Sequence, residues 1–434
     1  MGRQRRILVP MDGSRRWAAL AVLLVAEAMN LLDTTIVQVA APAVYAELGG
    51  SAGTISFYTA GYTLPFALFL ITGGRLGDVI GRRRTFRLGV TGFVVASALC
   101  AAATTPAFLL VFRVLQGTFA ALVIPQTIGL IRVLFDGPAR ARALGTIGPV
   151  MGLAAVSGPV LGGLLTHAWS WRAVFLVNVP LGLAVLVASG LLVEDRAATR
   201  PRLDLTGTAL VALGAGLVVY PLLTHWNGYL VAAGVVTLAV FVVHQRVRGN
   251  LIERSLFRDG GFPAALVTSL LFFAVMTGLT QVMVLWLQLT ENVDVRTAGL
   301  TLLPWSCGLA VSSLVAGQWL VPRYGTRILY TGVGLLTVGV IGLIFLRPVL
   351  VPLGVAGLGT GLFTVPFFTA ALDRVRPAET GSASGLLNAV QQLGGTVGVS
   401  VLTAVFLASG LTAACWTAVA LVVAAGVAAA GRLA

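Results

Sequence analysis

The segment LLVAEAMNLLDTTIVQVAAPAV, Leu23–Val44, is an apolar run of membrane-spanning length that contains two acids. A helix needs about 20 mainly apolar residues to cross the ~30 Å hydrocarbon core of a bilayer. Glu27 and Asp33 are costly inside such a helix, because a charged side chain in a bilayer needs a partner or a watery cavity. The segment therefore predicts a transmembrane helix in which the two acids serve a function.

The composition of the whole chain also indicates a membrane protein. Of 434 residues, 57% are hydrophobic and 10% are charged, whereas soluble domains average roughly 45–50% apolar and 25% charged residues. The net charge of +14 comes from short arginine clusters between apolar runs. Such clusters are typical of membrane topology, and a nucleic-acid binder would instead gather its charge on one solvated face.

Residue usage excludes several kinds of chemistry. All 29 basic residues are arginine, so the chain has no lysine for a Walker A loop or for a Schiff base. Cys100, Cys307 and Cys415 lie far apart without CxxC or metal-ligand spacing and are interpreted as small core residues. We expect neither a metal nor another cofactor.

The apolar runs predict an all-α polytopic membrane protein with fourteen transmembrane helices. Their approximate spans are 17–43, 54–73, 86–104, 107–131, 143–166, 173–193, 205–223, 229–243, 263–289, 297–320, 329–346, 349–371, 384–407 and 411–431. With the N-terminus in the cytoplasm, 25 of the 29 arginines fall on the cytoplasmic side and three fall outside. This asymmetry favours an even number of helices and two cytoplasmic termini.

Three regions follow from this order of helices. We predict a six-helix bundle over residues 1–193 and a second six-helix bundle over residues 262–434. Residues 194–261 form a linker that carries two extra transmembrane helices. Its last part, residues 244–261, mixes arginine with leucine and phenylalanine, which suits a segment on the inner membrane surface.

The predicted cytoplasmic loop after the second helix carries the sequence GRLGDVIGRRR, Gly74–Arg84. Its glycines permit a tight turn, its aspartate can accept hydrogen bonds at a helix end, and its arginines can reach acids or lipid phosphates. A solvated basic loop is an equally good interpretation of these residues alone. The loop resembles the G-x-L-x-D-x-x-G-R-R pattern of the major facilitator superfamily at Gly74, Leu76, Asp78, Gly81, Arg82 and Arg83.

Three further motifs, in the expected order, extend this resemblance over nearly the whole chain. RVLQGTFAA, residues 113–121, resembles the R-x-x-Q-G pattern of helix 4 in the family. LDTTIVQVAAP, residues 32–42, is similar to the helix 1 signature of the 14-helix drug:H+ antiporter branch. The antiporter motif of helix 5 is matched by residues 148–165 at Gly148, Gly158, Pro159, Gly162 and Gly163. The resemblance implies a major facilitator fold with two inserted central helices, and it implies that the helix 5 face seals the outward side.

Asp33 and Arg113 are predicted to lie at the same depth in the membrane. With a rise of 1.5 Å per residue, each residue lies about 21 Å above the cytoplasmic face of the membrane. We therefore expect the two charges to interact, directly or through Gln116 or water. A static ion pair that only joins two helices is the alternative.

Glu27 is predicted to lie near the midplane, about 12 Å from the cytoplasmic side, with Asn30 and Thr34 on the same side of the helix. A buried carboxyl without a basic partner favours its protonated form, which suits exchange of a proton for a cationic substrate. A permanently protonated structural carboxyl is the alternative. Asn388 and Gln391 are candidates for the same cavity, although polar contacts between helices are the favoured explanation for them.

Together these features predict a proton-coupled exporter of a lipophilic, cationic or amphipathic drug or antibiotic. We expect it to act as a monomer in the cell membrane by alternating access, with a small-molecule substrate and protons as its partners and without nucleic acid. Asp33 and Glu27 are the predicted proton carriers, Arg113 tunes Asp33, and the 74–84 loop braces the closed inner face. The alternatives are a nutrient importer of the same fold and a non-transporting membrane sensor. The three histidines fall in separate loops, so no enzyme site is expected.

Overall fold

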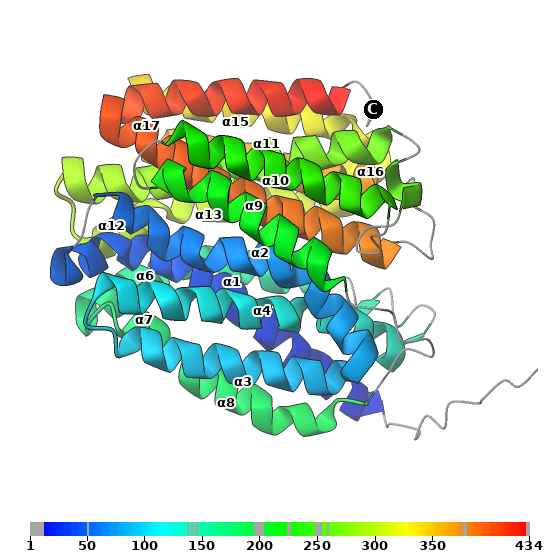
Figure 1. Ribbon diagram of the computed structural model, residues 1–434. Helices are drawn as coiled ribbons and strands as arrows, with labels where there is room; N and C mark the ends of the chain where they lie inside the picture. Colours follow the sequence, from blue (N-terminus) through cyan, green and yellow to red (C-terminus); the bar gives the residue numbers. More distant parts are fainter. Residues whose placement is uncertain are drawn as a thin grey trace, which may run out of the picture.

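Helices formed by the apolar runs make up the described part of the structure (Figure 1). The computed structural model describes residues 13–49, 52–136, 139, 142–143, 146–194, 204–223, 227–247, 254–257, 260–373, 375 and 380–430. Within these ranges the regular structure is entirely helical. The predicted all-α architecture is therefore confirmed for the described part of the chain.

The N-terminal helices lie together in the lower part of Figure 1 and the C-terminal helices in the upper part. The N-terminal helices are α1 (Gly13–Leu48), α2 (Ala52–Ile80), α3 (Arg82–Ala101), α4 (Pro106–Leu134), α6 (Ile147–Ala168), α7 (Ala173–Leu176) and α8 (Asn178–Ala188). The C-terminal helices are α11 (Gly261–Leu285), α12 (Val295–Thr301), α13 (Leu303–Val315), α14 (Val321–Tyr324), α15 (Ile328–Phe345), α16 (Leu350–Asp373) and α17 (Thr380–Ala430).

Local sequence signals account for several helix ends. Thr105 caps α4, since its side chain accepts a hydrogen bond from the Phe108 N–H and Pro106 occupies the first turn. Asp294 caps α12 by accepting from the backbone N–H groups of Arg296 and Thr297. Gly81, with φ 107°, separates α2 from α3 in a conformation that L residues rarely adopt. The chain therefore turns where the sequence provides caps and glycines.

Eleven helical stretches of the described chain are long and apolar enough to cross a membrane, and a shorter apolar helix covers Leu205–Pro221. Two of the eleven, Val295–Phe345 and Ala383–Ala430, contain 51 and 48 residues. At 1.5 Å per residue each is more than twice as long as the ~30 Å hydrocarbon core. Glycines with positive φ interrupt both, Gly325 the first and Gly410 the second. The predicted total of fourteen crossings is not confirmed by this count.

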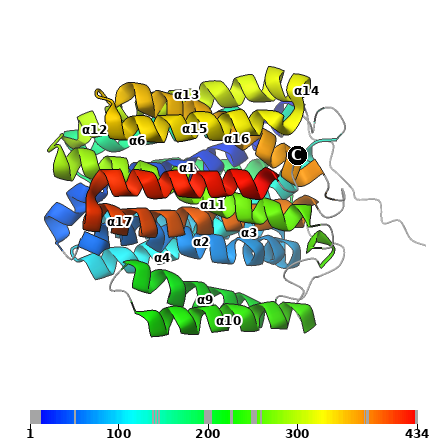
Figure 2. The same cartoon turned by 90° about the horizontal axis from the view of Figure 1, so that it is seen from above.

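The two inserted helices, α9 (Leu205–Leu223) and α10 (Gly228–Val247), lie along one side of the bundle (Figure 2). Helix α9 packs against α2 and α17, and the Thr72 and Thr208 hydroxyls are 2.8 Å apart. Asp204 joins the pair by accepting from His244 at 3.0 Å and Gln245 at 2.7 Å. Partial burial opposes the charged form of Asp204, but hydrogen bonds from Gly207, His244 and Gln245 hold its pKa below the usual value. Residues 248–253 and 258–259 of the predicted interfacial segment 244–261 lie outside the described residues.

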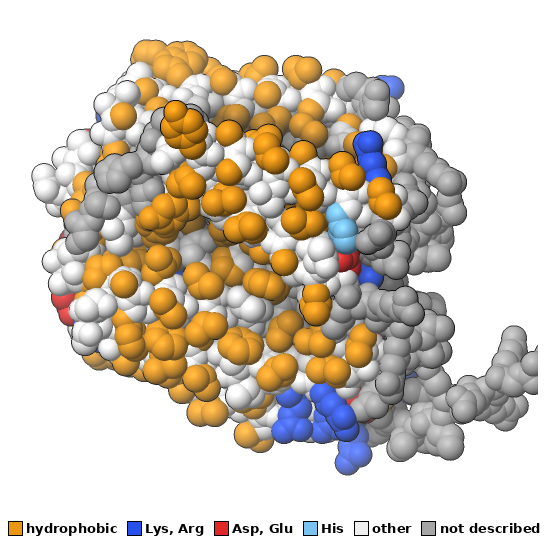
Figure 3. Space-filling view, viewed as in Figure 1, with side chains coloured by type: hydrophobic (Ala, Val, Ile, Leu, Met, Phe, Trp, Pro, Cys, Tyr) orange, Lys and Arg blue, Asp and Glu red, His pale blue; other side chains and the backbone are white. Residues whose placement is uncertain are grey.

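Hydrophobic side chains cover much of the molecular surface, and arginines gather at one end (Figure 3). On α10, Tyr229 is 91% exposed and Val247 is 69% exposed. Soluble monomers rarely expose apolar patches of this extent. The outer surface of the helices is therefore suited to lipid.

Candidate functional site

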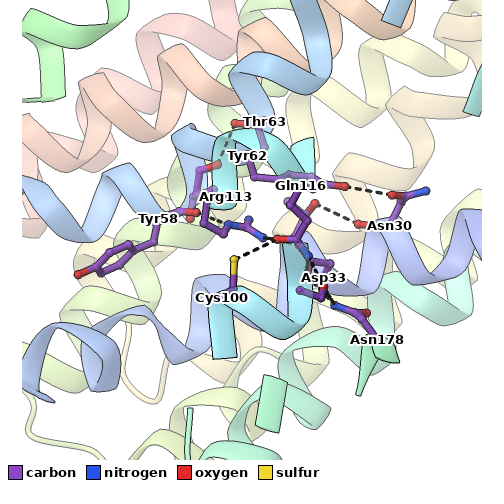
Figure 4. Close-up of polar contacts among 12 residues, drawn as sticks. Asn30, Asp33, Tyr58, Tyr62, Thr63, Cys100, Arg113, Gln116 and Asn178 are labelled. Atoms are coloured by element: carbon purple, nitrogen blue, oxygen red, sulfur yellow. Dashed lines mark hydrogen bonds and ion pairs between the residues drawn. The ribbon is translucent and has the colours of Figure 1, made fainter. Parts of the chain in front are cut away.

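The site centres on an ion pair between α1 and α4. Asp33 and Arg113 are both fully buried, and Arg113 Nη1 lies 2.5 Å from Asp33 Oδ2. Figure 4 shows the two side chains pointing toward each other from their helices. The sequence predicted these charges at one level, and the structure brings them into direct contact.

Two side-chain amides bind the other oxygen of the Asp33 carboxylate. Gln116 Nε2, on α4, and Asn178 Nδ2, at the start of α8, each donate to Asp33 Oδ1 at 2.8 Å (Figure 4). A buried carboxylate is costly unless it is paired and hydrogen-bonded. Three donors, one of them charged, therefore satisfy the buried oxygens of Asp33.

Arg113 is held by α2 as well as by Asp33. Its Nε donates to the backbone carbonyl of Tyr58 at 2.9 Å, and its Nη1 also donates to Gln116 Oε1 at 2.7 Å. The guanidinium lies 4.5 Å from the centre of the Tyr62 ring, a cation–π distance. Its buried Nη2 has no hydrogen-bond partner within the described part of the structure. The two N–H groups of Nη2 are therefore available to other acceptors if the site rearranges.

A glycine next to Gln116 makes this geometry possible. A Cβ at Gly117 would overlap the backbone carbonyl of Tyr62, so α2 and α4 approach more closely than larger residues allow. This close approach places the Tyr58 carbonyl and the Tyr62 ring against Arg113. The R-x-x-Q-G pattern therefore supplies the cation, an amide and the packing contact of the site.

Glu27 and its neighbours form a second buried polar group on α1. Glu27 and Asn30 are buried, and the Glu27 carboxyl faces the Thr127 side chain of α4. Tyr62 donates to Asn30 Oδ1 at 3.2 Å, and Thr34 donates to the Asn30 carbonyl of its own helix at 3.2 Å. Tyr62 therefore contacts both Asn30 and Arg113, and it links the second group to the ion pair.

The other cavity candidates lie apart from this network. Asn388 and Gln391 are half-buried on α17, and neither contacts the Asp33 network within the described residues. Helix α17 meets α2 at another point, where Thr63 and Thr396 share a hydrogen bond of 2.7 Å. That Asn388 and Gln391 share a substrate cavity with Asn30 and Thr34 therefore stays a prediction.

The predicted inner loop, residues 74–84, is almost entirely helical, because α2 continues to Ile80 and α3 begins at Arg82. Asp78 Oδ1 and Arg82 Nη2 are 3.0 Å apart, one helical turn along the chain. Gly81 provides the turn, and a Cβ at Gly74 would come within 3.3 Å of Pro125. Arg83 Nε is buried without a hydrogen-bond partner among the described residues. The loop therefore joins α2, α3 and α4.

The helix 5 glycines lie on α6, where the N-terminal and C-terminal helices meet. A Cβ at Gly158 would overlap Thr35 of α1, and one at Gly162 would come within 2.8 Å of the Ile36 carbonyl. On the other side, a Cβ at Gly163 would come within 2.8 Å of the Val295 carbonyl of α12, and one at Gly299 would overlap the Pro159 carbonyl. Gly148 lies in the first turn of α6, with surroundings outside the described residues. The motif therefore packs α6 tightly against both α1 and α12.

Two residues of the network, Asn178 and Ser97, were missed by the sequence analysis. Ser97 Oγ of α3 accepts from Gln116 Nε2 at 2.6 Å and from Asn178 Nδ2 at 3.2 Å. Asn178 interrupts the apolar sequence of residues 173–188. Polar residues inside transmembrane helices often bond across to another helix, and this signal could have found Asn178.

The long apolar helices and their exposed apolar surface define a multi-pass helical membrane protein. Residues 23–399 match the model of the Major Facilitator Superfamily. The chain belongs to this superfamily of transporters.

The curated relatives of the chain are exporters and resistance proteins. It is 44% identical to a "probable actinorhodin transporter" of Streptomyces coelicolor over 92% of this chain and 73% of the relative. It is 35% identical to a puromycin resistance protein of Streptomyces alboniger, covering 92% and 83% of the two chains. It is 34% identical to a tetracenomycin C resistance and export protein of Streptomyces glaucescens, covering 89% and 75%. The resemblance to drug exporters of the superfamily is therefore confirmed.

Solved structures support the fold. The chain superposes on the human organic anion transporter MFSD10 with a TM-score of 0.67 at 15% identity, covering 96% of this chain and all of the other. A peptide transporter of the POT family gives a TM-score of 0.71 at 13% identity, with 95% and 96% covered. At these identities the likeness concerns the fold alone.

Proposed function

We propose that this protein is a proton-coupled exporter of lipophilic, cationic or amphipathic antibiotics or drugs. The observation that carries the proposal is the buried Asp33–Arg113 pair, in a chain whose relatives include a tetracenomycin C resistance and export protein and a probable actinorhodin transporter. An ionisable pair inside a transmembrane bundle is by default a candidate for ion or proton coupling. The export activity of the relatives argues against the alternative of a nutrient importer.

The hydrogen bonds around Asp33 suggest how a proton acts on the site. Every contact that the Asp33 carboxylate makes with Arg113, Gln116 and Asn178 comes from a donor group. A proton on Asp33 neutralises the carboxylate, so the hydrogen bond from Arg113 loses its charge assistance. Protonation therefore weakens the attachment of Arg113 to α1, and release of the proton restores it. Glu27, near the same helix face as Asn30, is the proposed carboxyl at which a cationic substrate replaces a proton.

Contacts between the N-terminal and C-terminal helices support one closed end in this conformation. They include the packing of α6 on α12 and a hydrogen bond of 3.0 Å from Gln288 Nε2 to the Val39 carbonyl of α1. All of these contacts lie toward the C-terminal end of α1. We assign this end to the outer side of the cell membrane, with both termini in the cytoplasm.

The remaining features of the proposal concern topology. We propose fourteen crossings, with two in each of the stretches Val295–Phe345 and Ala383–Ala430 and one in the shorter helix Leu205–Pro221. On this assignment residues 1–193 and 262–434 are two six-helix bundles, with the α9–α10 pair inserted between them in the sequence. The protein acts as a monomer, the substrate and protons share the passage between the bundles, and the 74–84 loop braces the inner face when it closes.

Replacing Gly299 with alanine is expected to open the outer end and lower efflux. The new Cβ would overlap the Pro159 carbonyl, and overpacking of this kind costs roughly 1–3 kcal/mol. That cost falls only on the conformation in which α6 and α12 touch. Labelling of a cysteine at Thr35 by a membrane-impermeant maleimide should therefore increase. Gly152→Ala is the matched control, because a Cβ there meets nothing within 4 Å. Equal labelling of the Gly299→Ala, Gly152→Ala and unmodified proteins would contradict the assignment.

The function is tested with everted membrane vesicles that have been acidified by respiration. We expect at least one compound among actinorhodin, puromycin and tetracenomycin C, the compounds named for the relatives, to be taken up in a manner that stops when the proton gradient is dissipated. Uptake that survives dissipation of the gradient would contradict proton coupling. Vesicles without the protein give the background.

A further inference from the structure

We propose that Asn178 is a positioning residue for proton exchange at Asp33, and that together with Gln116 it directs the proton to Oδ2, the oxygen that Arg113 holds. The inference rests on the proposed role of Asp33 as a proton carrier. It adds a residue from α8, a third helix, to the pair formed by α1 and α4.

The first observation is that Asn178 repeats the contacts of Gln116. Gln116 Nε2 donates to Asp33 Oδ1 at 2.8 Å and to Ser97 Oγ at 2.6 Å. Asn178 Nδ2 donates to the same two atoms at 2.8 Å and 3.2 Å. A primary amide has two N–H donors, so each amide uses both. The result is a closed ring of four hydrogen bonds that joins α1, α3, α4 and α8.

This ring fills one oxygen of the carboxylate. A carboxylate oxygen has two lone pairs in its plane, and the amides of Gln116 and Asn178 occupy both on Oδ1. The remaining oxygen, Oδ2, is bound by Arg113 Nη1. An incoming proton therefore binds Asp33 at Oδ2, which keeps one free lone pair beside Arg113. Protonation neutralises the carboxylate and so weakens the charge-assisted hydrogen bond from Arg113, which couples the proton to the contact between α1 and α4.

The surrounding packing fixes the position of Asn178. It is 1% exposed. Four residues later, a Cβ at Gly182 would overlap Val94 of α3 and lie 3.6 Å from Met29 of α1, so α8 is pressed against both helices. Just before α7, Trp171 and Arg172 bind the Glu47 carboxylate of α1. These contacts hold the Asn178 amide in place beside Asp33.

The other titratable groups near Asp33 are few. Arg113 of α4 pairs with it, Cys100 of α3 contacts Gln116 Oε1 at 3.9 Å, and Tyr62 of α2 lies over the guanidinium. Glu27 lies on α1 itself, and α7 and α8 contain no charged residue. A change at Asn178 therefore acts on the protonation of Asp33 through the hydrogen bond that it removes.

The test is a pH titration of the purified full chain in lipid, followed by infrared spectroscopy. The signal is the C=O band of a protonated carboxyl that disappears in Asp33→Asn, so it reports proton binding without a substrate. Asn178→Val removes both donors at similar volume. A hydrogen bond to a charged group is worth about 1.5–3 kcal/mol, so we expect the midpoint of this band to move about one to two pH units higher.

The matched control is Ser97→Ala. It breaks the same ring but leaves both amides bonded to Asp33, so its midpoint should stay with that of the unmodified protein. A midpoint in Asn178→Val equal to that in Ser97→Ala would overturn the proposal. If Asn178→Val does not fold, Asn178→Asp carries the test, because a second carboxyl beside Oδ1 disfavours the charged form and moves the midpoint higher still. An unchanged midpoint in Asn178→Asp would overturn the proposal equally.

These outcomes are separate from those of the proposed function. If Asp33→Asn retained proton-driven efflux, Asp33 would not be the proton carrier, whatever the midpoint in the Asn178 variants. If Asp33→Asn lost efflux and the Asn178 variants showed no shift, Asp33 would remain the proton carrier and the positioning role of Asn178 would be contradicted.

Discussion

Replacing Asp33 with asparagine is expected to abolish proton-driven efflux while the protein still folds. The amide matches the carboxyl in size and keeps an oxygen for Arg113, but it cannot take up or release a proton at physiological pH. Asp33 is fully buried and bound by three donor groups. The substitution therefore removes the titratable group with little change in shape, and efflux should fall to background.

The measurement is antibiotic uptake into energised everted vesicles at equal protein amounts. Size-exclusion chromatography and thermal unfolding check the fold. Gln38→Asn is the matched control, because Gln38 is a buried polar residue on the same helix that makes no contact with Asp33 among the described residues; this variant should transport normally. Full transport by Asp33→Asn would remove Asp33 from the mechanism.

Replacing Arg113 with leucine is expected to destabilise the protein strongly as well as to stop efflux. Removing one partner of a buried ion pair leaves an uncompensated charge and typically costs about 3–5 kcal/mol. In this case the charge is Asp33, which is 0% exposed. Protonation of Asp33 relieves the cost, so the stability deficit should be smaller at acidic than at alkaline pH. Thermal unfolding of the purified protein across this pH range measures the deficit.

The double variant Asp33→Asn with Arg113→Leu separates the two effects. It removes both charges, so we expect it to recover much of the lost stability and none of the efflux, which gives a non-additive double-mutant cycle. A purely structural ion pair predicts that efflux returns together with stability. A double variant that transports would therefore contradict the role of the pair in coupling.

Much of the fold could be predicted because the bilayer fixes the length of a helix. The predicted span 205–223 coincides with α9, and 349–371 differs from α16 by one or two residues at each end. The total number of crossings could not be decided in the same way. The second helix of each long stretch follows a glycine turn at Gly325 or Gly410, and length and composition alone do not divide such a stretch.

The depth of the site residues in the membrane could be predicted from the sequence. The rotation of each helix about its axis, which decides where a side chain points, could not. The rise per residue placed Asp33 and Arg113 at one level, and the same estimate puts Ser97 and Asn178 within a few ångströms of it. Whether side chains at one level meet depends on how each helix turns about its axis, which contacts such as that of Gly117 with Tyr62 decide. Asn178 and Ser97 illustrate the limit, because their contacts with Asp33 and Gln116 depend on this rotation.

The most direct test of the central claim is the proton gradient itself. Everted vesicles that contain the protein are acidified, the gradient is read with a pH-sensitive dye, and puromycin, actinorhodin or tetracenomycin C is added. We predict that at least one of these compounds partly collapses the gradient in vesicles with the unmodified protein, and that the same compound has no effect in vesicles with Asp33→Asn. Uptake of the compound with an undisturbed gradient, or an equal collapse in both kinds of vesicle, would contradict proton exchange at Asp33.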